Sequence, residues 1–263
     1  MKKYVAELLA AQGVSVGRCI DLRRVQLLME RMHPVTTGAG LIRMGAEADG
    51  GYLVPDDLEG IAACFSPGVD VKASFEEAFV ARKIPCYLAD ASVAGAPIVD
   101  PLIHFDKKFL GVVDDELSIS MDRWVKRYAP PTGDLVLQMD IEGAEWPVLL
   151  NVSEEVLLRF RVIVLELHYL ERLIDQVGFE FLFATLDRLL RHYHVVHLHP
   201  NNVIRPLNVA GLSIPRLLEV TLLRRDRAQP TGYAKHFPHP LDRKNDPLRP
   251  DIVLPAGWYR SAN

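Results

Sequence analysis

The sequence predicts an α/β protein built on a mostly parallel β-sheet with helices on both faces. Three observations support this fold class. From about residue 60 onward, strand-like apolar runs alternate with helix-like segments. The runs are continuously apolar rather than alternating, which is typical of strands buried on both faces. The chain also has 263 residues, 49% of them hydrophobic, which is enough for one large domain with a full core.

The amino-terminal part has a different character. Residues 2–12 and 21–33 have helical spacing, and each stretch is followed by a helix-breaking Gly or Pro. Asp49-Gly50-Gly51 is a turn signal between two short strand-like pieces. We therefore expect an amino-terminal helical segment and a short hairpin in front of the regular alternation.

The alternating region supplies the sheet and its covering helices. Its strand-like runs, in chain order, are GIAACFSPG, PCYLADAS, LIHF, GDLVLQMDIEG, RVIVLELH, HVVHLHPNN and RLLEVTLLRR. Its helical segments are KASFEEAFVARK, SMDRWVKRY, SEEVLLRF and GFEFLFATLDRLLRHY. Ser153, followed by Glu154 and Glu155, is a typical helix start because the hydroxyl caps free N–H groups and the acids favour the helix dipole.

These patterns divide the chain into three parts. Residues 1–40 form the expected helical cap, and residues 41–225 form the sheet domain. Residues 226–263 are rich in Pro, Arg, Asp and His and lack periodicity. This last part is either a tail that packs over the domain or a partly disordered end.

Composition excludes several function classes. The net charge of -4 gives no global basic field for nucleic acid, and no apolar run approaches the roughly 20 residues of a membrane span. Glu7 interrupts the apolar amino terminus, so this stretch reads as a helix rather than a signal peptide. Three widely spaced cysteines show no metal-ligand spacing and indicate reduced thiols of a cytoplasmic protein.

In parallel sheets, ligands bind beyond the carboxyl ends of the strands, so polar residues there are the candidate site. The first run ends in a turn containing Gly68, which lets backbone N–H groups approach a ligand. The second run ends at Asp90, where a carboxylate can accept hydrogen bonds from both hydroxyls of a ribose. Together they favour a nucleoside ligand, although an ordinary loop and a capping Asp explain each residue equally well.

The later strand ends carry carboxylates and imidazoles. Asp140 ends the fourth run, Glu166 and His168 end the fifth, and His197 and His199 end the sixth. We expect these three ends to be neighbours, so that together they supply either a general base with its orienting partner or a site for a divalent cation. We take His168 or His199 as the base. Two further acids, at positions 142 and 145, open the next helix; we expect the first to join the site and the second to be structural.

The residues also resemble a known family. LQMDIEGAEWPVL (137–149) resembles the Asp-x-Glu-Gly-x-Glu signature of FkbM-type methyltransferases. CFSPGVDVKASFEEAFVARKIPCYLADAS (64–92) looks like the cofactor segment of that group, and DGGYLVP and HLHPNN also recur in its relatives. The resemblance covers roughly residues 40–225, and it implies the seven-stranded sheet of class I S-adenosylmethionine-dependent methyltransferases.

The resemblance also implies an activity and a set of site residues. The expected reaction is O-methylation of a hydroxyl on a sugar, glycan or natural product, with S-adenosylmethionine as methyl donor. The expected cofactor contacts are Phe65, Ser66, Gly68, Phe75, Glu76, Asp90, Ala91 and Asp140. The expected catalytic residues are His168, His199, Asp140 and Glu166, and the expected ligands of a Mg²⁺ or Mn²⁺ ion are Asp140, Glu166 and His168.

Two alternatives remain open from the residues. The first turn holds a single glycine, which favours a binding domain that kept the fold and lost turnover. Pro67 and Val69 also stand where small residues are common in the class, and this departure bears on the cofactor contacts of the first turn. A nitrogen or carboxylate acceptor is equally compatible with the sequence. The partner is expected to be a small-molecule or glycan acceptor and not nucleic acid, and the oligomeric state is left open.

Overall fold

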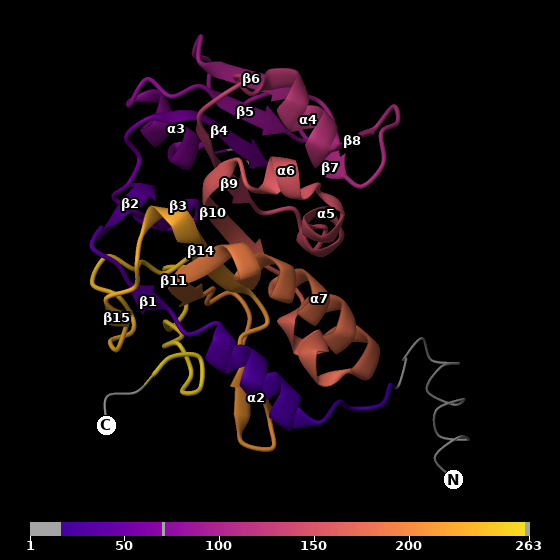
Figure 1. Ribbon diagram of the computed structural model, residues 1–263, viewed down its shortest axis with the longest axis vertical. Helices are drawn as coiled ribbons and strands as arrows, with labels where there is room; N and C mark the ends of the chain where they lie inside the picture. Colours follow the sequence, from indigo (N-terminus) through magenta and orange to yellow (C-terminus); the bar gives the residue numbers. More distant parts are fainter. Residues whose placement is uncertain (1–16, 70–71, 261–263) are drawn as a thin grey trace.

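A seven-stranded sheet forms the centre of the computed structural model, which describes residues 17–69 and 72–260 (Figure 1). Its strand order is β11-β14-β10-β9-β4-β5-β6. The strands are β4 Ile61–Pro67, β5 Cys86–Ala89, β6 Ile103–Asp106, β9 Asp134–Met139, β10 Phe160–Leu167, β11 Tyr193–Pro200 and β14 Leu218–Arg224. Only β14 runs antiparallel to its neighbours, β10 and β11; the other pairs are parallel. The predicted mostly parallel sheet is confirmed.

The chain reverses its direction of travel across the sheet between β4 and β9. From β4 it moves outward through β5 to β6, and it then returns to place β9 on the other side of β4. Phe65 on β4 pairs with Leu137 on β9. The loops after β4 and β9 therefore diverge and leave a crevice at the carboxyl edge, where ligands bind in sheets of this kind.

Helices cover one face of the sheet and a mixed layer covers the other. The first face carries α2 Leu22–Arg31, α4 Met121–Tyr128, α5 Glu145–Asn151, α6 Glu154–Leu157 and α7 Gln176–His192 (Figure 1). The second carries α3 Ser74–Val80 and the hairpin of β2 Leu41–Gly45 and β3 Gly51–Pro55. The second layer has one helix and much loop, so polar side chains gather under it.

Strand parity assigns each side chain to one of these layers. On β9, Leu135, Leu137 and Met139 belong to the helix-covered core, while Val136 belongs to the core under α3 and the hairpin. Alternate residues of a strand point to opposite faces, so both faces need apolar residues. This two-sided burial explains why the strands read as continuous apolar runs.

Local signals account for the helix starts. The Ser153 side chain accepts a hydrogen bond from Val156 N and caps α6, as predicted. Asp175 caps α7 in the same way by accepting from Gly178 N. The helix expected over residues 2–12 lies outside the described residues.

Short elements complete the fold. They are β1 Val35–Thr36 with β15 Gly232–Tyr233, β7 Phe109–Gly111 with β8 Ser118–Ser120, β12 Leu207–Val209 with β13 Leu212–Ile214, and the 3-10 helices η1 Leu170–Ile174 and η2 Arg225–Arg227. Residues 228–260 pack on the domain: Trp258 is fully buried, and its indole N–H donates to Ser213 O at 3.0 Å. Among the described helices, none has the length and hydrophobicity to cross a bilayer.

Candidate functional site

The turn after β4 is held tightly against the end of β9. Gly68 has φ +86°, and a Cβ built there would lie 1.6 Å from the carbonyl oxygen of Asp140. Its N–H donates to Ala89 O at 3.1 Å, which ties the same turn to β5. Glycine is required at this position because any side chain would clash with the backbone of β9 and strain the left-handed conformation.

Asp90 fixes this turn from the end of β5. Its Oδ2 accepts from Val69 N at 3.0 Å, and its Oδ1 accepts from the N–H and hydroxyl of Ser92, both at 2.6 Å. A carboxylate has about four acceptor positions. Three are used here, so Asp90 retains one for a ligand.

Two cavities meet at this point. One, of about 460 Å³, lies between the turn, the loop after β5 and β7, and Asp90, Ser92, Phe109 and Glu142 contribute to its wall. The second, of about 300 Å³, lies beneath the β2–β3 hairpin and the carboxyl-terminal segment. Gly68, Val69 and Asp140 line both cavities. A molecule bound in either cavity would therefore lie against Asp140.

Asp140, which is half-buried, and Glu166, which is buried, form a pair of interacting acids. Burial raises the pKa of Asp140, even though contact with Glu166 and the charge of His168 act in the opposite direction. Burial and the Asp140 charge raise the pKa of Glu166 well above its ordinary value. Glu166 Oε1 also accepts from Asn201 Nδ2 at 2.6 Å. Each acid therefore disfavours the ionised form of the other.

His168 also lies close to Asp140 and contacts two further acids. Its Nε2 is 3.9 Å from Asp140 Oδ1 and 3.3 Å from Glu142 Oε2, and its Nδ1 is 3.3 Å from Glu145 Oε1. Burial lowers the pKa of His168, but the neighbouring carboxylates, led by Glu145, outweigh burial and raise it. One ring nitrogen therefore faces a buried acid and the other faces the acid cluster at the cavity.

Glu145 has a larger role than the sequence indicated. Its side chain is fully buried, and Oε1 accepts from Ile141 N at 2.7 Å as well as facing His168. It therefore holds the start of α5 and orients the imidazole at the same time. A helix-start acid is usually solvated, and only its burial reveals this function.

Two non-glycine residues close to His168 have strained, left-handed backbone conformations. Tyr169, the next residue, has φ +61°, and Glu142 has φ +57°. Between them, Gly143 packs so closely that a Cβ there would lie 2.3 Å from the Tyr169 ring. Left-handed non-glycine residues cost free energy and persist where the surrounding structure needs a particular geometry. Here that geometry brings Glu142 and His168 together.

These side chains also offer ligands for a cation. Ligand atoms of Asp140, Glu142 and His168 lie within 4.8 Å of one another. Asp140 Oδ1 is buried and has no hydrogen-bond partner among the described residues. Two carboxylates and an imidazole suit a divalent metal. The structure groups Asp140 and His168 with Glu142, whereas the sequence had grouped them with Glu166.

His199 does not join this cluster, and the assumption behind its choice was wrong. β10 and β11 are not neighbours, because the antiparallel β14 lies between them. Glu219 on β14 pairs in register with both Glu166 and His199. Adjacent strands lie about 4.8 Å apart, so His199 is displaced from Glu166 by about 10 Å.

His199 instead belongs to a clamp on the carboxyl-terminal segment. Asp242 lies between two imidazoles, with His197 Nε2 at 2.8 Å and His199 Nδ1 at 3.5 Å. Asp242 and the neighbouring Glu219 overcome burial and raise the pKa of His199 to about 9. A histidine that is charged at neutral pH and buried against an acid stabilises the fold and is poorly suited to accept a proton.

The remaining expected cofactor residues fall into two groups. Phe75 and Glu76 line the second cavity. Phe65, Ser66 and Ala91 line neither cavity. Phe65 points into the helix-covered core, where its ring lies 5.0 Å from that of Trp124, because its strand parity directs it away from the hairpin face. Ser66 is buried and hydrogen-bonded to Glu76.

No protein-family model matches this chain, and no curated protein matches its sequence. The function is therefore argued from the residues of this site.

Proposed function

We propose that this chain is an S-adenosylmethionine-dependent methyltransferase that methylates a hydroxyl of a sugar or another small molecule. One observation carries the proposal: Gly68, Asp90 and Asp140, from three separate strand ends, line a single cavity of about 460 Å³ at the reversal of the sheet. A seven-stranded, mostly parallel sheet is also what the resemblance to class I methyltransferases implies.

The cavity suits a nucleoside cofactor in size and chemistry. Its volume lies in the range of small-ligand sites, roughly 300–1,000 Å³. The remaining acceptor position of Asp90 can receive a ribose hydroxyl, and Val93, Phe109 and Ile141 offer apolar surface for a base. The methionyl end would then lie toward Gly68 and Asp140.

The second cavity suits the acceptor. It shares Gly68 and Asp140 with the first cavity and is lined by polar groups, among them Tyr52, Lys72 and Gln138. Methyl transfer is an in-line displacement, so donor and acceptor must approach from opposite sides of the methyl carbon. Two cavities that meet at one carboxylate provide this arrangement.

His168 is the proposed general base. The acceptor oxygen forms a bond to the methyl carbon, and the carbon–sulfur bond breaks with its electron pair remaining on sulfur. His168 lines neither cavity, so the hydroxyl proton passes by way of Asp140, which lines both, to Nε2 of His168, 3.9 Å from Asp140 Oδ1. Glu145 stabilises the imidazolium through Nδ1. Because its pKa is raised, His168 must lose its proton before it can act, and the rate is expected to rise with pH through that pKa.

Asp140, Glu142 and His168 would hold a divalent cation if the enzyme uses one, and the ion would then supply a Lewis acid that lowers the pKa of the acceptor hydroxyl. Treatment with EDTA, followed by addition of Mg²⁺ or Mn²⁺, separates the two roles. Activity that resists the chelator assigns His168 to proton transfer alone.

The second candidate function is adenosylmethionine binding without turnover. The first turn has a single glycine, which favours this second function. Gly68 packs closely against Asp140 O and is not free to let a ligand approach the backbone there. A bound cofactor with no transfer to any of a panel of sugars, phenols, amines and carboxylates would favour this function.

Titration calorimetry with S-adenosylmethionine tests the proposal. The wild-type chain is expected to bind, and Asp90→Asn is expected to bind about tenfold more weakly because a hydrogen bond to a charged acceptor is weakened. Asp100→Asn is the matched control: Asp100 accepts from the N–H of Leu102, two residues on, at 2.8 Å, and lines neither cavity. Absence of binding at millimolar cofactor would overturn the proposal.

A further inference from the structure

A third cavity, larger than the two at the carboxyl edge, lies at the amino edge of the sheet. Its volume is about 790 Å³. Charged side chains dominate its wall: Arg159, Arg161, Arg191, Arg224, Arg225, Asp134 and Asp226. Five arginines in one concave surface are unexpected in a chain whose net charge is -4.

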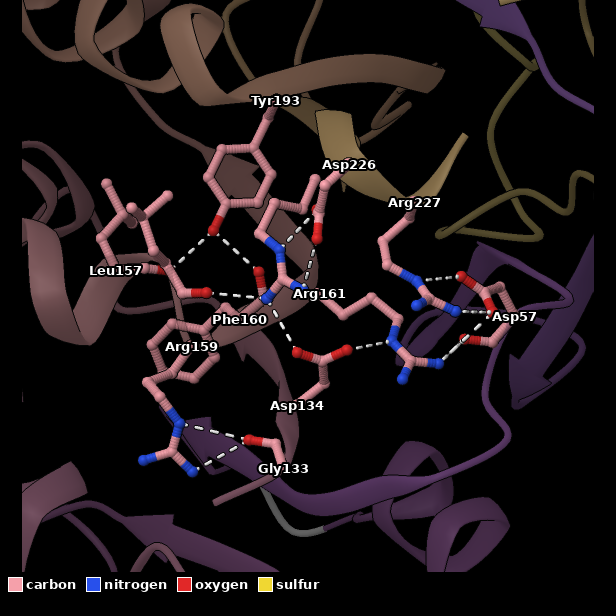
Figure 2. A network of polar contacts seen from close by, with 12 residues as sticks. Asp57, Gly133, Asp134, Leu157, Arg159, Phe160, Arg161, Tyr193, Asp226 and Arg227 are labelled. Atoms are coloured by element: carbon pink, nitrogen blue, oxygen red, sulfur yellow. Dashed lines mark hydrogen bonds and ion pairs between the residues drawn. The ribbon is translucent and has the colours of Figure 1, made fainter. Parts of the chain in front are cut away.

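Part of this cluster is structural (Figure 2). Asp134 lies between two arginines, with Arg161 Nε at 2.7 Å from Oδ2 and Arg224 Nη1 at 2.9 Å from Oδ1. Arg224 also makes two hydrogen bonds to Asp226, at 2.7 and 3.0 Å. Two carboxylates therefore balance two guanidinium groups.

The other arginines leave an excess of positive charge. Arg191 pairs with Asp187, one turn earlier on α7. Arg159 and Arg225, by contrast, donate only to backbone carbonyls among the described residues: Arg159 to Pro130 and Gly133, and Arg225 to Leu190. These two charges face the cavity without a carboxylate.

Arg161 adds a buried donor to the wall. The residue is only 5% exposed, and its Nε and Nη1 are occupied by Asp134, Asp57 and Glu59. Its Nη2 donates to no described residue and faces Gly60, where a Cβ would lie 4.0 Å away. Gly60 also lines the cavity, so this N–H group is held in place and directed at the cavity wall.

We propose that this cavity binds a phosphate-bearing small molecule. Guanidinium groups present paired N–H donors that match phosphate oxygens, and a group fixed by other contacts loses little freedom on binding. A concave site of this volume fits a sugar phosphate or nucleotide better than it fits an extended acidic peptide.

The site is separate from the proposed methyl-transfer site. Asp134 opens β9, and Asp140 directly follows its end. Six residues at about 3.3 Å per residue place the two sites about 20 Å apart. A phosphate bound here is therefore neither donor nor acceptor of the methyl group, and the inference does not depend on the proposed function.

Titration calorimetry of the full chain with inorganic pyrophosphate tests the inference. Wild-type protein is expected to bind, and Arg159→Gln with Arg225→Gln is expected to weaken binding by at least about tenfold. Arg23→Gln with Arg123→Gln removes the same charge from exposed positions outside the cavity and is expected to leave affinity unchanged. The exposed Arg225→Gln alone serves if the double variant unfolds.

The inference would be overturned by no binding at about 10 mM pyrophosphate, by equal losses in the cavity and control variants, or by tighter binding of a hexaglutamate peptide than of pyrophosphate. Saturating S-adenosylhomocysteine is expected to leave the pyrophosphate affinity unchanged. Competition between the two ligands would place pyrophosphate at the carboxyl edge instead and would equally contradict a separate site.

Discussion

The two ends of β9 carry the same residue type in opposite surroundings. At the amino end, contacts with Arg224 and Arg161 outweigh burial and lower the pKa of Asp134. At the carboxyl end, burial raises the pKa of Asp140, and its Oδ1 has no hydrogen-bond partner among the described residues. One aspartate is fully paired and the other is left incompletely satisfied.

This difference separates stability from chemistry along a single strand. A paired acid lowers the free energy of the native state, whereas a buried acid without a partner raises it unless a ligand supplies one. The strain at Glu142 and Tyr169 lies at the same carboxyl edge. Two of the four left-handed non-glycine residues among those described, and the unpaired Oδ1 of Asp140, therefore lie where the proposed reaction takes place.

The largest expected effect is at the paired end. Asp134→Ala leaves Arg161, which is 5% exposed, without its closest carboxylate, and we expect the free energy of unfolding to fall by about 3 kcal/mol. Asp226→Ala removes a largely exposed partner of Arg224 and is expected to cost less than about 1 kcal/mol. Urea unfolding of both variants measures the difference, and equal losses would show that Asp134 is not the central ion pair.

The Asp242 clamp shows that acids at the carboxyl edge can also be paired. The pKa of His199 is raised to about 9 from an ordinary value near 6.5, so its contribution is complete below pH 6.5 and is lost as pH rises through 9. Glu219, whose pKa burial raises to about 7, acts in the same direction and is present in every variant.

We expect wild-type protein to lose up to roughly 3 kcal/mol of unfolding free energy between pH 6.5 and pH 9.5 through this clamp. Asp242→Asn is expected to lose much less over the same interval, because the acid that charges His199 is gone. Urea unfolding at the two pH values gives both slopes. Parallel slopes would mean that Asp242 does not set the charge of His199.

At the carboxyl end of β9, beside the unpaired Asp140, the expected effect is a loss of turnover. His168→Ala is expected to reduce methyl transfer by about 100-fold, a typical contribution of a general base, while S-adenosylmethionine affinity is retained. His199→Ala is the control, since it removes an imidazole from the same edge of the sheet but from the clamp. Full activity in His168→Ala, or an equal loss of turnover in both variants, would reject the assignment of the base.

The smallest expected effect is at Asp140, where the change in the free energy of unfolding has the opposite sign to that at Asp134. Asp140→Asn removes a charge that repels Glu166, so we expect the free energy of unfolding at pH 7 to stay constant or to rise by about 1 kcal/mol. The same variant is expected to lose methyl transfer. A stability loss comparable with that of Asp134→Ala would show that Asp140 is a structural acid.

Much of the fold was predictable because strand burial on both faces leaves a direct mark on the sequence. The acids and imidazole that follow β9 and β10 were also found from position, since parallel strands bring their carboxyl ends together. Asp140 and His168 converge for this reason.

The errors have a different origin. Strand order is set by long-range packing, and nothing in RLLEVTLLRR indicates that this last strand inserts between β10 and β11 and moves His199 away. Burial of a helix-start acid such as Glu145 is likewise invisible in a one-dimensional pattern. The arginine cavity was missed because its residues come from the amino ends of parallel strands, where ligands are not expected, together with the end of α7 and the carboxyl end of β14. The antiparallel direction of β14, which brings its end to this edge, was not predicted.

A crystal structure with S-adenosylhomocysteine tests the central claim most directly. We predict that the ribose hydroxyls contact Asp90, that the homocysteine sulfur lies near Gly68 and Asp140, and that the cavity beneath the hairpin stays open for the acceptor. Binding at any other place on the molecule, or saturating ligand that leaves the cavity beside Asp90 empty, would contradict the proposed methyltransferase.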